Sequence, residues 1–170
     1  MVSISTVLQK RCGTIILAVV VLLCLTPLTI FAVPQVVGAD HSYVIVSSSM
    51  EPAVGQGDAI FVDSVSPQAV ERGDIITFSE QVNNTTTSGS GQVVTHRVAN
   101  ISHKNGTIQF QTKGDANEEV DPVPIPASAL IGVVTFQIPL LGYFIAFAST
   151  PLGNLALVGL PMGLLIVNEL

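Results

Sequence analysis

The chain has 170 residues, of which 48% are hydrophobic and only 11% are charged, and its mean hydropathy is +0.62. This composition is too apolar for an ordinary soluble protein of this size, so it predicts a membrane protein with room for one modest globular domain. Twelve acidic residues against six basic ones give a net charge of -6. That balance argues against nucleic acid as a partner, because binding a phosphate backbone needs clustered Lys and Arg.

The first long apolar segment runs from Cys12 to Ala39 and contains no charged residue. Ile15–Val37 is long enough, at the rise of a helix, to cross a hydrocarbon core of about 30 Å. We therefore predict a transmembrane helix over residues 14–38. Lys10 and Arg11 stand just before this helix. Because basic residues favour the cytoplasmic side, they predict that residues 1–13 lie in the cytoplasm and that the chain after the helix lies outside.

A cleaved secretory signal is the alternative for this segment. Val37-Gly38-Ala39 stands before Asp40 and has the small residues of a cleavage site. However, the apolar core exceeds the roughly 7 to 15 residues of such signals. The length favours a membrane anchor.

Residues 39–138 are predicted to form an extracytoplasmic, β-rich domain. Apolar and polar residues alternate with period two in short runs, which Gly and Pro separate, and no interval has a convincing helical period. The runs are Tyr43–Val46, Asp58–Val62, Asp74–Phe78, Gln92–Val94 and Thr107–Phe110.

A polar stretch over residues 83–91 is typical of a flexible loop. Sequons for N-glycosylation occur at Asn83, Asn84, Asn100 and Asn105. Their position in the middle domain agrees with its external placement, because a sequon matters only where a glycosylation system can reach it.

The last part of the chain is again apolar. Leu130–Phe136 is rich in β-branched residues and predicts a strand. Residues 139–170 form an apolar C-terminal segment, in which residues 143–167 are a predicted transmembrane helix. Pro151 and Pro161 would bend that helix, so an in-plane or re-entrant segment is the alternative.

Ser49 is a candidate nucleophile because it follows an apolar run and precedes a turn that contains Pro52 and Gly55. A strand end fixes a side chain, and the following turn offers backbone N–H groups to an oxyanion. Taken alone, three serines before a turn are more often solvated or capping residues.

A serine nucleophile needs a general base, for which the chain offers His96, His103, Lys104 and Lys113. His96 lies in the strand-like run Val93–Val98, which would hold its ring in a fixed orientation. His103 and Lys104 lie in a segment whose composition is typical of a turn, which would not hold either side chain in a fixed orientation. His96 is therefore the better candidate, although a structural histidine in a strand is the plainer interpretation.

An imidazole base works best when a carboxylate orients it. Residues 112–121 supply four acidic side chains between two predicted strands, among them Asp115 and Asp121. A solvated acidic loop or a calcium site is the alternative, but the spacing does not fit an EF-hand loop. We expect neither a metal nor a cofactor.

In this order, the motifs resemble signal peptidase I of the archaeal and endoplasmic-reticulum branch. The branch has Ser-Gly-Ser-Met-Glu-Pro, Arg-Gly-Asp-Ile, His-Arg-Val and Lys-Gly-Asp-Asn boxes. The matching segments are Ser47–Pro52, Arg72–Ile75, His96–Val98 and Lys113–Asn117. Ser48 departs from the glycine of the first box.

The resemblance implies a mainly β, signal-peptidase-like catalytic domain and a serine endopeptidase that removes signal peptides from secreted preproteins. It implies that Ser49 is the nucleophile and that His96 is the base, in place of the lysine of the bacterial branch. It favours Asp121 over Asp115 as the acid that orients His96, without excluding Asp115.

The same resemblance implies the cell membrane as the location, with the catalytic domain on the extracytoplasmic face. Signal peptides and membrane lipid would be the partners, with association with the secretion translocon as a further expectation. The competing hypothesis is a non-enzymatic, membrane-tethered β-domain that binds exported proteins and uses the serine turn only structurally.

Overall fold

The computed structural model describes residues 4–80, 92–104 and 106–169. The chain divides into two compact units, one made of Met1–Val33 with Tyr143–Leu170 and the other of Pro34–Gly142. The predicted loop over residues 83–91 lies outside the described residues, as do three of the four sequons, at Asn83, Asn84 and Asn105.

Helix α1 (Ile4–Ala32) begins the first unit. Its part Gly13–Ala32 has a mean hydropathy of 2.8 and is, by length and composition, long and apolar enough to cross a membrane. The helix ends six residues before the predicted limit of residue 38. The cause is Pro34, which disfavours helical geometry in the residue before it and starts the 3-10 turn Pro34–Val37.

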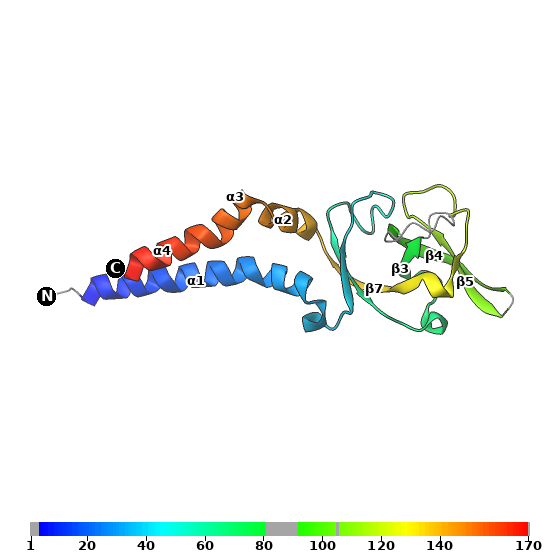
Figure 1. The fold of residues 1–170 in the computed structure, drawn as a ribbon, viewed down its shortest axis with the longest axis horizontal. Coiled ribbons are helices and arrows are strands. Elements are labelled where there is room, and N and C mark those ends of the chain that lie inside the picture. The colour runs from blue at the N-terminus through cyan, green and yellow to red at the C-terminus, as the bar shows by residue number, and fades with distance from the viewer. Residues whose placement is uncertain (1–3, 81–91, 105, 170) are drawn as a thin grey trace. The chain divides into compact units, whose positions relative to one another are not determined.

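The C-terminal apolar segment is not one continuous helix. Helix α2 (Leu141–Ala148) is followed by α3 (Pro151–Asn154), the π-helical turn η4 (Leu155–Gly159) and α4 (Leu160–Glu169). Within their unit, η4 and α4 contact α1, as Figure 1 shows for α4.

The chain bends by 89° between α2 and the helical stretch that begins at Pro151. Thr150 has an extended backbone there, and its hydroxyl accepts a hydrogen bond of 3.0 Å from the N–H of Gly153, so it caps the new helix. Pro161 stands at the start of α4, directly after the π-helical turn η4, and α4 continues past it to Glu169. The predicted bend is therefore at Pro151, and a C-terminal membrane span stays a prediction.

The second unit contains one antiparallel sheet. Its described strands are β1 (His41–Val44), β2 (Ala59–Asp63), β3 (Ile75–Glu80), β4 (Gln92–Lys104), β5 (Thr107–Lys113), β6 (Ile125–Pro126) and β7 (Leu130–Ile138). They lie in the order β1-β2-β7-β3-β4-β5-β6, and every neighbouring pair is antiparallel. The prediction of a mainly β domain is thus confirmed.

Two strand limits differ from the prediction. The strand predicted over Tyr43–Val46 lies two residues earlier in the structure, as β1 (His41–Val44). Val46 follows the strand and is 79% exposed. His103 and Lys104 lie in β4 and not in a turn, since the ladder with β5 continues to Lys104. Both differences arise from strand pairing, which local composition does not specify.

The core consists of two hydrophobic clusters. One packs Val70, Ile76, Phe78, Val98, Phe110 and Ile125 between β3, β4, β5 and β6. The other contains Ile45, Met50, Val54, Ile60 and Val62. The second cluster holds the turn that carries Ser49, and the first supports the strand that carries His96, so both side chains stand on packed elements.

Candidate active site

Ser49 stands at the start of a turn that is anchored by its neighbour. The Met50 side chain is only 1% exposed and belongs to the second core cluster. Within the turn, the N–H of Glu51 donates to the carbonyl of Ser48, and the N–H of Val54 donates to the carbonyl of Met50. Because burial of a methionine of this size contributes about 1.5–3 kcal/mol, Met50 fixes the turn and thereby the serine.

A loop after β5 closes on the same turn. The N–H of Ala116 donates a hydrogen bond of 2.9 Å to the carbonyl oxygen of Ser49. A Cβ atom on Gly114 would lie 2.6 Å from that carbonyl oxygen, so the approach requires glycine at this position. The loop that carries the fourth box, Lys113–Asn117, is thus held against the turn that carries Ser49.

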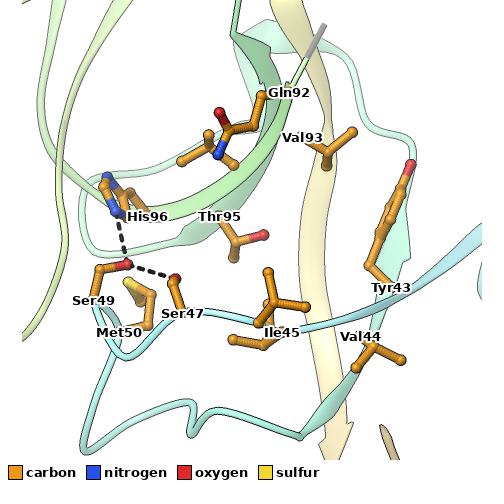
Figure 2. Close-up of a pocket in the computed structure, with 12 residues that line it drawn as sticks. Tyr43, Val44, Ile45, Ser47, Ser49, Met50, Gln92, Val93, Thr95 and His96 are labelled. Carbon is orange, nitrogen blue, oxygen red and sulfur yellow. Dashed lines mark hydrogen bonds between the residues drawn. The ribbon is translucent and has the colours of Figure 1, made fainter. Parts of the chain in front are cut away.

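His96 lies on β4, where it pairs with Ile76 of β3. Its Nε2 is 3.1 Å from the Oγ of Ser49, as Figure 2 shows, and its Nδ1 is 2.7 Å from Oδ2 of Asp121. The His96 side chain is 12% exposed, and its ring meets the edge of Phe78. With Nδ1 protonated and donating to Asp121, Nε2 is free to accept the hydroxyl proton of Ser49.

Asp121 is held by β5. Its Oδ2 accepts a hydrogen bond of 2.7 Å from the hydroxyl of the fully buried Thr112, and its N–H donates to the carbonyl of Thr112. The side-chain amide of Gln111 donates to the carbonyl of Asp121. The carboxylate that faces His96 therefore has a fixed position.

Asp115 takes a different place. Its two carboxylate oxygens accept hydrogen bonds of 2.8 and 2.6 Å from Nε and a terminal nitrogen of Arg97, whose other terminal nitrogen donates to the carbonyl of Gly73. The hydrogen bonds from Arg97 hold the pKa of Asp115 below its ordinary value, and the same bonds raise the pKa of Arg97. The two acids named from the sequence thus have separate partners.

The other candidate bases lie away from the serine. His103 and Lys104 are exposed at the far end of β4. Lys113 is the last residue of β5 and lies opposite Arg97 in the ladder of β4 and β5. In the described part of the chain, no hydrogen bond joins any of them to Ser49. Nor do three or more His, Cys, Asp or Glu side chains converge among the described residues, so the calcium alternative finds no support there.

A pocket of about 280 Å³ opens beside Ser49. Figure 2 shows Tyr43 and Ile45 on one wall and Gln92, Val93 and Thr95 on the other. Three strands separate β1 from β4 in the sheet, so the sheet curls to bring both to one pocket.

Each wall of this pocket contains a strand segment that joins only one ladder among the described residues. Strand β1 pairs with β2 on one side only, and residues 92–96 of β4 pair with β3 alone, because the ladder with β5 begins at Arg97. These statements hold for the residues that the structure describes. Such edges offer backbone donors and acceptors to an added strand.

Sequence reasoning assigned no role to Thr112 and Arg97, although both hold acidic residues of the site. Thr112 lies two residues after the buried Phe110 in β5, so it faces the core with period two. A polar residue at a core-facing position needs a hydrogen-bond partner, and this pattern could have singled it out. The pairing of Arg97 with Asp115 has no comparable signal, because it joins residues that are distant in sequence.

Comparison with known proteins places these elements in a family. The family model described as signal peptidase, peptidase S26, matches residues 12–106, which is more than half of the chain. The chain belongs to this family. The matched region contains Ser49 and His96, whereas Asp115 and Asp121 lie beyond it.

Individual relatives agree with this assignment. Signal peptidase I W of Bacillus subtilis is 32% identical over 97 residues, and the match covers 56% of this chain and 47% of the relative. The human signal peptidase complex catalytic subunit SEC11C is 37% identical over 79 residues, covering 46% of this chain and 38% of the relative. SEC11 of Candida tropicalis is 31% identical over 142 residues, covering 74% of this chain and 80% of the relative. The matches to the first two span less than half of their length.

Proposed function

We propose that this protein is a membrane-bound serine endopeptidase that removes signal peptides from secreted preproteins. The observation that carries the proposal is the hydrogen-bonded series from Asp121 through His96 to Ser49, with distances of 2.7 and 3.1 Å. Family membership supports it independently. In this proposal Ser49 is the nucleophile, His96 is the general base and Asp121 is the acid that orients it.

The first half of the reaction forms an acyl-enzyme. The Oγ of Ser49 attacks the carbonyl carbon of the scissile bond while Nε2 of His96 accepts the hydroxyl proton. Asp121 stabilises the imidazolium through its hydrogen bond to Nδ1. The tetrahedral intermediate then collapses, the C–N bond breaks, and His96 returns the proton to the leaving amine.

In the second half, a water molecule replaces the amine beside His96. His96 removes a proton from the water as the water attacks the ester carbonyl, and then protonates the Oγ of Ser49 as the C–O bond breaks. The signal peptide leaves with a free carboxylate. The enzyme returns to its starting state, with no cofactor consumed.

Ser47 is positioned to help hold the oxyanion. Its Oγ lies 3.2 Å from the Oγ of Ser49, so its hydroxyl can turn toward an oxygen that forms next to the nucleophile. A donor aimed at the developing charge contributes about 3–4 kcal/mol to transition-state stabilisation in known oxyanion holes.

Asp115 is a positioning residue in this proposal. Through Arg97 it connects β4, immediately after His96, to the loop that touches the carbonyl of Ser49. It would therefore maintain the distance between base and nucleophile without taking part in proton transfer. This assignment follows the preference for Asp121 that the sequence resemblance implied.

We propose that the substrate binds as an extended strand between β1 and residues 92–96 of β4. Among the described residues each of these segments joins one ladder, so its outer edge would supply backbone partners, and a volume of only about 280 Å³ favours small side chains. The resemblance adds that the small residues stand at the first and third positions before the cut.

The family is membrane-associated, and the apolar helix α1 agrees with such an anchor. We propose that the N-terminus is cytoplasmic and that the catalytic domain is extracytoplasmic, because Lys10 and Arg11 precede the apolar stretch. Lipid, exported preproteins and the translocon would be the partners, as in the archaeal and endoplasmic-reticulum type. Anchoring would raise the local concentration of substrates whose own apolar helix lies in the membrane.

Cleavage of a preprotein by purified protein in detergent tests the proposal. Ser49→Ala and His96→Ala should each lower kcat by about 10⁴-fold or more, because the members of such a site act as a unit. Ser66→Ala and His103→Ala are matched controls, since Ser66 and His103 are exposed and outside the site. A Ser49→Ala protein that cleaves as fast as its parent would refute the protease assignment.

A further inference from the structure

A second hollow adjoins the site on the other side of His96. It measures about 720 Å³, and its walls are Phe78 and Glu80 of β3, together with the segment Pro122–Pro126 that leads into the turn before β7. His96 and Val94 line both this hollow and the pocket beside Ser49. We call it the proline-walled groove.

We propose that the proline-walled groove receives the preprotein residues that follow the scissile bond. The inference rests on the proposed function and adds the path of the leaving half of the substrate. It starts from proton transfer: His96 takes the proton from Ser49 and must deliver it to the nitrogen of the scissile bond. That nitrogen therefore lies toward Nε2 of His96, and the chain attached to it continues on the histidine side.

The placement of the two hollows fits this path. Ser49 lines the smaller pocket and not the groove, whereas Asp121 lines the groove and not the pocket. A peptide whose carbonyl carbon is at Ser49, and whose preceding residues fill the pocket, would thus lead past His96 into the groove. The groove volume lies within the range of about 300–1,000 Å³ that is typical of ligand sites.

The composition of the wall predicts how the groove would bind. Pro122, Pro124 and Pro126 have no backbone N–H, and β6 already pairs with β5 through Ile125 and Pro126. The wall therefore cannot form a regular ladder with a substrate strand, unlike the edges of the pocket. Binding there would depend on side-chain contacts, so the residues after the cut would be selected by size and charge more than by backbone geometry.

The charges of the groove give it a preference. Its described lining residues include the carboxylates of Glu80 and Asp121 and no Lys or Arg. Asp121 is engaged by His96, whereas Glu80 is exposed. Acidic residues just after the scissile bond should therefore be disfavoured, and Glu80→Gln should reduce this discrimination.

The proposal can be tested with a substitution that places a bulky side chain on the exposed rim of the groove and so narrows it. Val123 lines the groove and is 68% exposed, so Val123→Trp can enter the hollow without disturbing the core. Val120→Trp is the matched control, because Val120 is 48% exposed in the same loop and lines neither hollow. Each protein is assayed on two peptides with the same signal sequence, one with six residues after the cut and one with a single residue there.

For Val123→Trp we expect kcat/KM on the long peptide to fall about tenfold or more, with less than a twofold change on the short peptide. Val120→Trp should leave both values within twofold of the parent. Equal losses on both peptides would mean that the tryptophan disturbs His96 or Asp121, and no loss on either would mean that the groove is empty during cleavage; both results overturn the inference. If the parent cleaves neither peptide, the proposed function fails and the inference falls with it.

Discussion

Arg97 binds Asp115 through two hydrogen bonds, while the residue before it, His96, binds Asp121. Neighbouring side chains of one strand thus use two carboxylates of the same loop for different purposes. One pair connects strand to loop, and the other forms part of the candidate catalytic series.

Asp121→Asn and Asp115→Asn should have unequal effects on catalysis. Asp121→Asn should lower kcat by about 10⁴-fold, since an amide can stabilise the wrong tautomer of His96 and cannot balance the imidazolium. Asp115→Asn should lower kcat by about tenfold or less and reduce the free energy of unfolding by about 1 kcal/mol, because the pair is partly exposed. The measurements are kcat on a preprotein and unfolding by denaturant; equal, mild losses of kcat would contradict the assignment of the acid.

Stability should depend on pH through Asp115. In the folded protein its pKa lies below the ordinary value of 3.8, chiefly because of the hydrogen bonds from Arg97. The unfolded chain therefore takes up the proton first, so the stabilisation is full above the ordinary pKa and is lost as pH falls through the lowered one. Between pH 5 and 2.5, the parent should lose more free energy of unfolding than Asp115→Asn; parallel curves would show that the pair contributes nothing.

Activity should fall as the pH is lowered, because the proposed mechanism needs a neutral His96. A protonated His96 cannot accept the proton of Ser49, so kcat/KM should decline tenfold per pH unit on the acid side. The profile of His103→Ala should be the same as that of the parent. If the general base were a lysine, activity would already be low at neutral pH and would rise only in the alkaline range in which amines lose their proton.

Gly114→Ala should damage the site although it adds one methyl group. The new Cβ would lie 2.6 Å from the carbonyl oxygen of Ser49, so the turn or the loop must shift. We expect kcat to fall about 10²-fold and stability to drop by about 1–3 kcal/mol. Gly13→Ala is the control, because a Cβ on Gly13 meets nothing within 4 Å; comparable kinetics for the two variants would argue against close contact at Ser49.

The small-residue motif that ends at Ala39 should remain uncleaved in the folded protein. Ala39 is 2% exposed, its N–H donates to the carbonyl of Pro34, and the N–H of Asp40 donates to that of Val62. The bond between Ala39 and Asp40 therefore cannot enter the active site of another copy without local unfolding. Intact-mass measurement of the active protein should show the full chain, and a fragment that begins at Asp40 would contradict this expectation.

Local patterns predicted the strands and the first apolar helix well. Period-two alternation located β2, β3 and β5 to within a few residues, and the β-branched residues of Leu130–Phe136 located β7. The positions of Ser49 and His96 followed from short boxes in a fixed order. In the structure these two side chains lie within hydrogen-bond distance, although 47 residues separate them.

Other features could not be derived from local patterns because they depend on distant partners. The division of labour between Asp115 and Asp121 depends on which of them meets Arg97 and which meets Thr112. The extension of β4 through His103 depends on its ladder with β5. The bend after α2 was anticipated from Pro151, but the cap by Thr150 that sets its position is a matter of backbone geometry.

The curled sheet has a consequence for the order of events in secretion. It brings β1 and residues 92–96 of β4, each joined to one ladder among the described residues, to the walls of a pocket of about 280 Å³, where we propose that an extended segment of the substrate binds. A segment that has already folded has committed its backbone groups to its own neighbours and cannot offer them here. Cleavage at this site would therefore have to occur before the exported protein folds around the cleavage site. The pocket would thus select substrates by their folding state as well as by their sequence.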